Sequence, residues 1–205
     1  MHSHETGPLI VMDLGGVLVR TVAHAQFAAL AAMTGIPPDR WSAAADGLTD
    51  DLESGRIGFS SFAAELAHRA GAPRLPLADI EDAWGLVIDR LDDKMAEIAA
   101  RLSSEKRLLF ASNTDPVHFA RVRRLLTADT IHAPCVASYE IGHRKPSESF
   151  FRAVTAADPR VRLGAVFIDD LTVNVKAARG SGLDGYHHTD TASTISYLLT
   201  LEAAT

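Results

Sequence analysis

The chain has 205 residues, of which 47% are apolar and 22% charged, and its formal net charge is −6. These values are typical of a folded globular protein with a large core, and they exclude a strong electrostatic attraction to nucleic acids or anionic membranes. A single cysteine, Cys135, excludes an intramolecular disulfide and a thiolate metal cage. We therefore expect a cytoplasmic monomer or homodimer that binds neither nucleic acid nor membrane.

The first predicted strand ends in a carboxylate and a glycine turn. The apolar run Leu9–Met12 predicts a buried strand, and Asp13 follows it directly, ahead of Gly15 and Gly16. In α/β sheets the chemistry lies at the carboxyl ends of the strands. A carboxylate beside a buried strand needs a metal, a hydrogen-bond network or a reaction to explain it, so Asp13 is the first candidate functional residue.

A long insert follows this turn. Roughly ninety residues separate the first predicted strand from the next, far more than a strand–helix–strand crossover needs. Within this stretch Phe59 and Phe62 follow helical spacing. We predict a small all-helical domain over residues 20–92, inserted after the first strand, with residues 1–19 and 93–205 forming the core.

Three later segments predict further short buried strands, each followed by a helical pattern. Strands that alternate with helices imply a parallel sheet covered on both faces, which is a three-layer, Rossmann-like α/β core. The loops after such strands gather at one edge of the sheet. The three segments are Arg107–Ala111, Pro134–Ala137 and Ala165–Ile168.

Polar side chains follow each of these strands. Together with Asp13 they supply carboxylates that suit a divalent cation, a hydroxyl and amides that suit phosphate oxygens, and a lysine that offsets the charge on both. Pro146 fits the first turn of the helix that comes after it. The groups are Ser112-Asn113-Thr114, Lys145-Pro146 and Asp169-Asp170, with Asn174 one helical turn later.

In order and spacing, these segments resemble the four signature motifs of the haloacid dehalogenase-like (HAD) superfamily. The helical insert lies where subfamily I of that superfamily places its C1-type cap. Within the subfamily, the chain resembles the branch of bacterial alpha-D-glucose-1-phosphate phosphatase-like proteins. One such motif is a weak signal, but four in register are a specific one. The matching segments are Asp13–Val17, Ser112–Thr114, Lys145–Pro146 and Asp169–Asp170.

The resemblance implies a magnesium site at the strand ends. Asp13 and Asp170 would bind Mg²⁺ through carboxylate oxygens, and Gly15 would bind it through its backbone carbonyl. Asp169 would hold a metal-bound water. Asn174 would fix the metal-binding loop without touching the ion.

The resemblance also implies catalytic and phosphate-binding roles. Asp13 would be the nucleophile that attacks phosphorus and forms an aspartyl phosphate, which water then hydrolyses. Ser112 and the backbone amide of Asn113 would bind the phosphoryl group that is transferred. Lys145 would neutralise the charge on that group and act with Asp13 in catalysis.

Gly15 departs from the family pattern. Most phosphatases of this superfamily have an aspartate there that protonates the leaving oxygen, and such help is worth on the order of 10² to 10⁴ in rate. Three explanations remain open: a leaving group that needs little protonation, such as an anomeric oxygen; a substitute acid, such as His24 or His143; and a slow or non-catalytic protein. Relatives with glycine here act on an anomeric sugar phosphate, so we favour the first.

The resemblance therefore implies a Mg²⁺-dependent hydrolase of phosphoric monoesters that acts on a small phosphorylated metabolite, such as a sugar phosphate. A phosphotransferase or mutase needs the acid–base group that Gly15 lacks. A 2-haloacid dehalogenase would use Asp13 on carbon without a metal, and it has no use for the Asp169-Asp170 pair. A binding protein on the same scaffold stays open because of Gly15 alone.

Overall fold

Parallel strands form the central sheet, in the order β5-β4-β1-β6-β7. The structure is a computed structural model, and it describes residues 7–128 and 130–203. β1 lies in the middle of the sheet, at the point where the strand order reverses, and the predicted parallel sheet is confirmed. The strands are Ile10–Met12 (β1), Leu108–Ser112 (β4), Cys135–Ala137 (β5), Val166–Asp169 (β6) and Asp184–His187 (β7).

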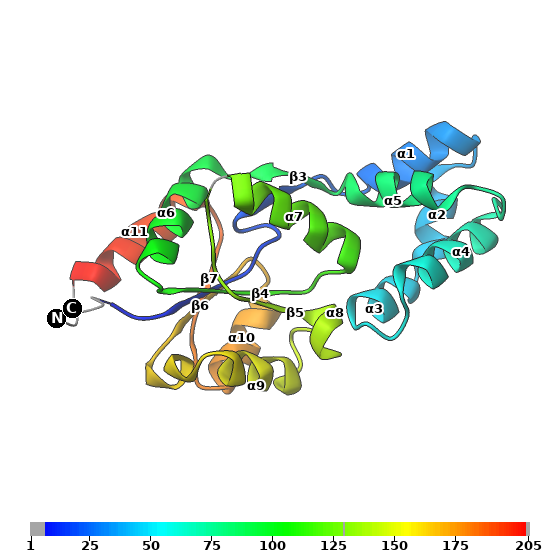
Figure 1. Ribbon diagram of the computed structural model, residues 1–205. Coiled ribbons are helices and arrows are strands. Elements are labelled where there is room, and N and C mark those ends of the chain that lie inside the picture. The colour runs from blue at the N-terminus through cyan, green and yellow to red at the C-terminus, as the bar shows by residue number, and fades with distance from the viewer. Residues whose placement is uncertain (1–6, 129, 204–205) are drawn as a thin grey trace.

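Helices cover both faces of this sheet, as Figure 1 shows, so the predicted three-layer core is confirmed. Helices α6, α7 and α11 pack on one face, and α9 and α10 pack on the other. The helices of the core are α6 (Asp93–Ser104), α7 (Pro116–Ala128), α8 (Ser138–Ile141), α9 (Glu148–Ala157), α10 (Thr172–Gly180) and α11 (Thr191–Ala203), with a 3₁₀ helix at Pro159–Leu163.

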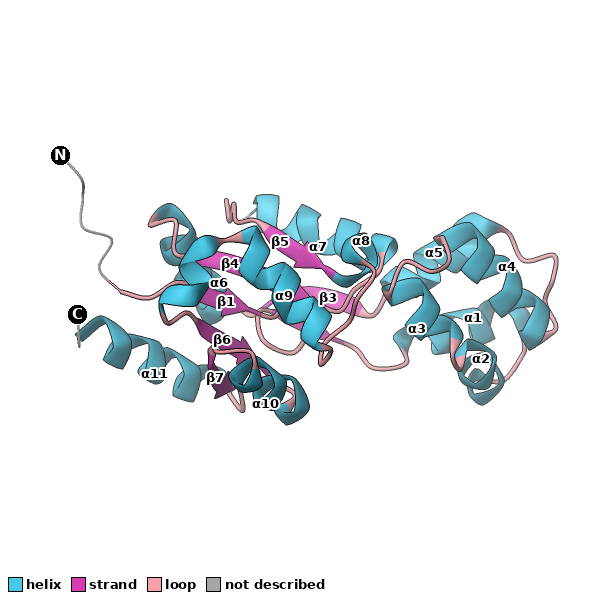
Figure 2. Ribbon diagram, turned by 90° about the horizontal axis from the view of Figure 1, so that it is seen from below, coloured by secondary structure: helices cyan, strands magenta, loops and turns pink. Residues whose placement is uncertain are grey.

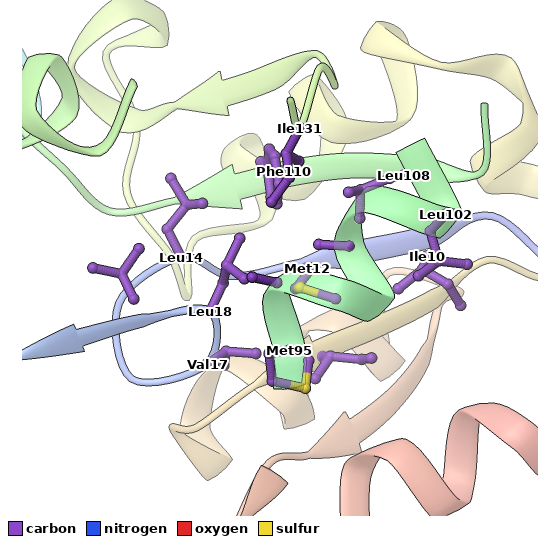
Figure 3. Packing of buried hydrophobic residues seen from close by; sticks show 14 of the residues in the cluster. Ile10, Met12, Leu14, Val17, Leu18, Met95, Leu102, Leu108, Phe110 and Ile131 are labelled. Carbon is purple, nitrogen blue, oxygen red and sulfur yellow. The ribbon is translucent and has the colours of Figure 1, made fainter. Parts of the chain in front are cut away.

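The side chains of β1 are buried on both faces of the sheet, which is why every position of the strand is apolar and not only every second one. Ile10 and Met12 point into the cluster beneath α6, where they pack with Phe110 and Met95 (Figure 3). Val11 points to the opposite face. Burying side chains of this size contributes about 1.5–3 kcal/mol each. This packing fixes the end of β1, and with it the position of the next residue along the chain.

The insert is a separate layer of helices with its own apolar cluster, and it lies at the opposite end of the molecule from α11 (Figure 2). Trp41, Phe62 and Trp84 are fully buried in that cluster. The helices are α1 (Ala25–Thr34), α2 (Pro38–Ala45), α3 (Leu48–Glu53), α4 (Phe59–Ala70) and α5 (Leu77–Gly85). All five lie inside the range predicted to be helical.

An antiparallel strand pair joins the insert to the core. β2 (Val19–Thr21) pairs with β3 (Ile88–Leu91), so the chain enters and leaves the insert side by side. Sequence patterns do not reveal this pair, because both strands are short and carry exposed polar residues such as Arg20. The boundaries proposed at residues 20 and 92 fall within the pair, and they stay a prediction.

Two local features differ from expectation. Pro146 is not in the first turn of a helix: its peptide bond to Lys145 is cis, and α9 begins two residues later behind Ser147. Ser147 caps α9 by accepting a hydrogen bond from the backbone N–H of Phe150 at 3.3 Å, a role for which serine is well suited. The edge strand β7 is only partly buried, so no apolar run marks it.

Candidate active site

The ends of β1 and β6 bring three carboxylates together. Met12 and Ile168 are paired across the two strands, so the residues that follow them, Asp13 and Asp169, emerge side by side. With Asp170 they form a group in which one oxygen from each carboxylate lies within 4.8 Å of the others. Three carboxylates at this separation are a donor set that suits a hard divalent cation such as Mg²⁺.

Lys145 is the positive charge of this cluster. Its Nζ lies 2.8 Å from Asp13 Oδ1 and 2.7 Å from Asp169 Oδ2, and it donates to the carbonyl of Ala111 at 3.0 Å. All three ammonium protons therefore have acceptors. Burial alone would lower the pKa of Lys145, but the two carboxylates outweigh it and hold that pKa above its usual value. Lys145 is thus a permanent cation.

One lysine does not balance three carboxylates. Burial raises the pKa of Asp13 to about 7, with Lys145 opposing the shift and Asp169 adding to it. The pKa of Asp170 is also raised, by burial and by Asp169. A bound cation would offset the negative charge of the three carboxylates, so these residues fit the magnesium ion that the sequence predicts.

Asp169 and Asp170 differ in how their oxygens are used. Asp169 accepts hydrogen bonds from the backbone of Leu171 at 2.8 Å and from Asn174 Nδ2 at 3.0 and 3.1 Å, in addition to Lys145. In contrast, no side chain of the described residues donates a hydrogen bond to the Asp170 carboxylate. Asp170 therefore has free lone pairs for a direct ligand bond, whereas Asp169 is held in place by its neighbours.

Gly16 makes room for Asp170. Its backbone has a φ of +74°, in the left-handed region that favours glycine. A Cβ at this position would collide with the carboxylate of Asp170. Both restrictions make glycine necessary here.

The loop after β4 lies beside the lysine. Asn113 Oδ1 accepts from the backbone N–H of Lys145 at 2.7 Å, and Asn113 Nδ2 donates to the Lys145 carbonyl at 3.0 Å. The side chain of Asn113 thus ties two predicted motifs together, a task that the sequence does not reveal. Among the residues that the structure describes, the buried Ser112 hydroxyl has one long contact, 3.4 Å to the Asn113 carbonyl, so it is available to a ligand.

A cavity of about 410 Å³ lies between the core and the insert. Gly15, Ser112 and Asn113 line it from the core, and the insert contributes aromatic and polar side chains. Those side chains include His24, Gln26, Phe27, Thr49, Glu53 and Trp84. The size suits a small metabolite rather than a polymer.

Comparisons with known proteins agree with this geometry. No protein-family model matches the chain, and no curated protein matches it in sequence. Among solved structures, the HAD family enzyme BT-2542 from Bacteroides thetaiotaomicron, in complex with magnesium and inorganic phosphate, is 22% identical at a TM-score of 0.80, over 92% of this chain and 98% of its own. A predicted HAD-like family hydrolase from Porphyromonas gingivalis is 28% identical at a TM-score of 0.77, over 95% of this chain and 98% of its own. By its fold, this chain is a HAD-like protein.

The superfamily predicted from the four motifs is therefore confirmed. An L-2-haloacid dehalogenase from Xanthobacter autotrophicus shares the HAD-like fold too, with 16% identity and a TM-score of 0.61 over 93% of this chain and 81% of its own. Likeness at this level of identity shows a common fold and leaves the substrate open. Subfamily I, the C1-type cap and the sugar-phosphate branch stay predictions.

A buried anchor holds the insert of this HAD-like chain to its core. Asp115 is fully buried and accepts hydrogen bonds from Trp84 Nε1 of the insert at 3.0 Å and from the backbone N–H of Val117 at 2.8 Å. His118 lies 2.7 Å from the same carboxylate, and its other ring nitrogen lies 2.8 Å from the Trp84 carbonyl. Sequence reasoning missed Asp115, although an Asp directly before Pro116 is a common start of a helix.

A second contact holds the opposite side of the insert. Arg144 pairs with Asp50 and, at 2.8 Å, with Glu53 Oε2, while Ser138 Oγ donates to the Glu53 carbonyl at 2.6 Å. Sequence reasoning did not find these contacts, because they join residues far apart in the chain. His143 is exposed and does not line the cavity, so it is poorly placed to replace the acid missing at Gly15.

Proposed function

We propose that this HAD-like protein is a Mg²⁺-dependent phosphatase that hydrolyses small phosphate monoesters through an aspartyl phosphate on Asp13. The observation that carries this proposal is the contact between Lys145, Asp13 and Asp169 beside the Ser112-Asn113 loop. It joins a carboxylate nucleophile, a fixed cation and a phosphate-binding loop. Support also comes from BT-2542, which was solved with magnesium and inorganic phosphate.

The metal-binding residues would be Asp13 and Asp170 through carboxylates and Gly15 through its carbonyl, with Asp169 acting through water. When bound, Mg²⁺ supplies positive charge for the phosphate oxygens. Asn174 keeps the Asp169 carboxylate oriented by donating to both of its oxygens. We assign the direct ligand role to Asp170 and the water-mediated role to Asp169 because hydrogen bonds occupy the oxygens of Asp169 and leave those of Asp170 free.

In the first step, a carboxylate oxygen of Asp13 attacks phosphorus as the bond to the leaving oxygen breaks, and that oxygen takes up a proton. In the second step, water attacks phosphorus as the bond from phosphorus to the Asp13 oxygen breaks, and the water gives up a proton to the phosphate that leaves, so that inorganic phosphate and the free Asp13 carboxylate result. Lys145 offsets negative charge on the phosphoryl group in both steps. Ser112 and the backbone of Asn113 hold the phosphoryl oxygens in position.

We further propose a sugar phosphate as substrate, with an anomeric phosphate among the candidates. Gln26 is nine-tenths buried at the cavity wall, and its amide oxygen has no hydrogen-bond partner among the described residues. A buried polar atom without a partner costs about 1–3 kcal/mol, which a sugar hydroxyl would recover if the amide turned toward the cavity to accept from it. Glu53 offers a second acceptor, and Phe27 and Trp84 supply the apolar surface that sugar rings pack against.

The test is phosphate release from a panel of phosphorylated sugars and p-nitrophenyl phosphate, with Mg²⁺ or with chelator. We expect metal-dependent turnover that falls by about 10³-fold or more in Asp13→Asn. Asp39→Asn, on an exposed position of α2, is the matched control and should keep its activity. Turnover that survives Asp13→Asn would contradict the proposal.

The similarity to a haloacid dehalogenase makes dehalogenation the second candidate. Such a reaction would use Asp13 on carbon and would need no metal, which leaves the Asp170 carboxylate without a purpose. Turnover of chloroacetate that chelator does not affect would move the assignment to a dehalogenase. Lack of turnover on every substrate would favour a binding protein.

A further inference from the structure

The cavity contains three candidate replacements for the acid missing at Gly15. The titratable side chains that line it are His24 from the start of α1, Glu53 from the end of α3 and His118 from α7. A general acid must carry a proton, have a donor atom free to face the leaving oxygen and release that proton without breaking a buried contact. The three residues differ on each of these requirements.

His118 is held in its charged form. Its two ring nitrogens face two acceptors, the Asp115 carboxylate at 2.7 Å and the Trp84 carbonyl at 2.8 Å, so both must carry protons. Burial acts to lower the pKa of His118, but Asp115 outweighs it and raises that pKa. Neither nitrogen is free for a ligand. His118 is therefore a fixed structural cation.

Glu53 is held in an ion pair. Its Oε2 lies 2.8 Å from Arg144, which also pairs with Asp50. Burial raises the pKa of Glu53, and Arg144 opposes that shift. Protonating this carboxyl would leave Arg144 without one of its two partners. Glu53 is thus better placed to accept hydrogen bonds than to deliver a proton.

His24 is free of such contacts. Its ring is exposed, stacks on Phe27 with 5.9 Å between ring centres, and makes no hydrogen bond to any other residue of the described chain. The ring nitrogens are therefore not already used by a neighbouring residue of the described chain. Solvent access also allows the ring to regain a proton after each turnover.

The backbone at His24 is left-handed, a conformation that is uncommon for residues other than glycine. His24 has φ +62° and ψ +8°, a left-handed conformation that glycine and asparagine adopt more readily. It also stands at the N-cap of α1 without capping it, where Ser, Thr, Asp or Asn would accept a hydrogen bond. Local structure therefore does not account for a histidine at this position, and residues in such conformations cluster at functional sites.

The position of the missing acid is open space on the same cavity. A Cβ on Gly15 would meet nothing within 4 Å except Thr21 Cγ2 at 3.8 Å. Gly15 and His24 both line the cavity next to the phosphate-binding loop. We propose that His24, not Gly15, supplies the proton for the leaving oxygen. This inference rests on the proposed phosphatase function.

In this step the bond from Asp13 to phosphorus forms while the bond from phosphorus to the leaving oxygen breaks. The electron pair of the broken bond stays on that oxygen, which takes the ring proton of charged His24. Neutral His24 then recovers a proton from solvent. Substrates whose leaving oxygen needs a proton gain most from this transfer. Aryl phosphates, whose leaving oxygen is stable as an anion, gain least.

The test compares two substrates in His24→Asn, a variant chosen because asparagine tolerates the left-handed backbone and caps helices. With Mg²⁺, we expect kcat for the best sugar phosphate of the panel to fall by about 10²-fold, while kcat for p-nitrophenyl phosphate changes less than about threefold. Glu53 and His118, the other titratable side chains that line the cavity, remain in both proteins.

A second-site change makes the test independent of folding. Gly15→Asp, for which the cavity has room, should restore most of the sugar-phosphate rate when added to His24→Asn. His132→Asn, at an exposed loop position, is the matched control and should leave both rates unchanged.

Several results would overturn the assignment. These are equal losses on both substrates, an unchanged sugar-phosphate rate, or a wild type that hydrolyses only the aryl phosphate. A substrate-selective loss in Glu53→Gln but not in His24→Asn would assign the proton to Glu53. Failure of the proposed phosphatase function is a separate result, since the wild type would then release no phosphate from p-nitrophenyl phosphate with Mg²⁺.

Discussion

The carboxylate cluster and the cavity beside it satisfy their polar atoms in opposite ways. In the cluster, Lys145 uses all three protons and Asp169 accepts from its neighbours on both oxygens. In the cavity, Gln26 has a buried oxygen without a partner, and the His24 ring makes no hydrogen bond within the described residues. These hydrogen bonds hold Lys145 and Asp169 in place for one reaction, whereas the unpaired polar atoms of the cavity wall can still bind a ligand. The comparison predicts large losses from changes in the cluster and selective losses from changes in the wall.

The largest effect is expected at Lys145. Among the described residues, Lys145 is the only cation that the buried Asp13 and Asp169 contact. Lys145→Met breaks this buried pair, which costs about 3–5 kcal/mol of unfolding free energy. Phosphatase activity should fall by about 10³-fold or more for the same reason. Urea unfolding and phosphate release measure the two effects. Lys94→Met, at an exposed position of α6, is the control, and near-normal stability of Lys145→Met would contradict the account.

The buried anchor between insert and core comes next. Asp115 outweighs burial and keeps the pKa of His118 above its usual 6.5, so the charged ring stabilises the fold fully below pH 6.5 and loses this effect as the pH rises through the raised pKa. His118→Gln should lower the unfolding free energy by about 2–3 kcal/mol near pH 6, and by less at higher pH. Urea unfolding of both proteins across this range measures the difference. A difference that does not change with pH would contradict the ion pair.

The third prediction tests whether Asn174 orients the metal-binding loop without binding the metal itself. Asn174→Ala removes one of the donors to Asp169, the one that bonds both of its oxygens, and should weaken Mg²⁺ binding by about 10-fold, as loss of a residue that orients a ligand does. Activity at saturating Mg²⁺ should recover most of its value. Titration of activity with Mg²⁺ measures this. Asn113→Ala is the comparison, because Asn113 holds the phosphate-side loop and its loss should leave the Mg²⁺ midpoint unchanged.

The smallest effect is expected at Gln26. Gln26→Leu removes a buried oxygen that has no partner within residues 7–128 and 130–203, so the unfolding free energy should stay the same or rise slightly. KM for the preferred sugar phosphate should rise by about 5- to 10-fold, the loss of one hydrogen bond of about 1 kcal/mol. KM for p-nitrophenyl phosphate should stay unchanged, since its ring has no hydroxyl to donate. An equal rise for both substrates would show that Gln26 only shapes the wall.

Much of the core could be predicted from the sequence, because its signals are local. The run Leu9–Met12 is apolar at every position, which a strand buried on both faces requires, and a carboxylate directly after it stands out. The same reasoning placed Ser112, Lys145 and Asp169 at strand ends. Parallel strands bring their ends to one edge, so convergence of these residues follows from the fold class alone.

Contacts across the boundary between core and insert depended on the tertiary structure. Asp115 meets Trp84 and Ser138 meets the carbonyl of Glu53 only because the insert folds back onto the core, and no spacing in the chain encodes such a contact. The unpaired amide oxygen of Gln26 and the left-handed backbone of His24 likewise became visible only in the tertiary structure.

The core and its charged strand ends follow from the amino-acid sequence, since short runs of residues specify burial and strand direction. Which cavity groups already have hydrogen-bond partners, and which are free, depends on how the chain folds. Hydrogen-bond partners from distant segments settle that difference: they hold His118 as a fixed cation and leave His24 open to a ligand.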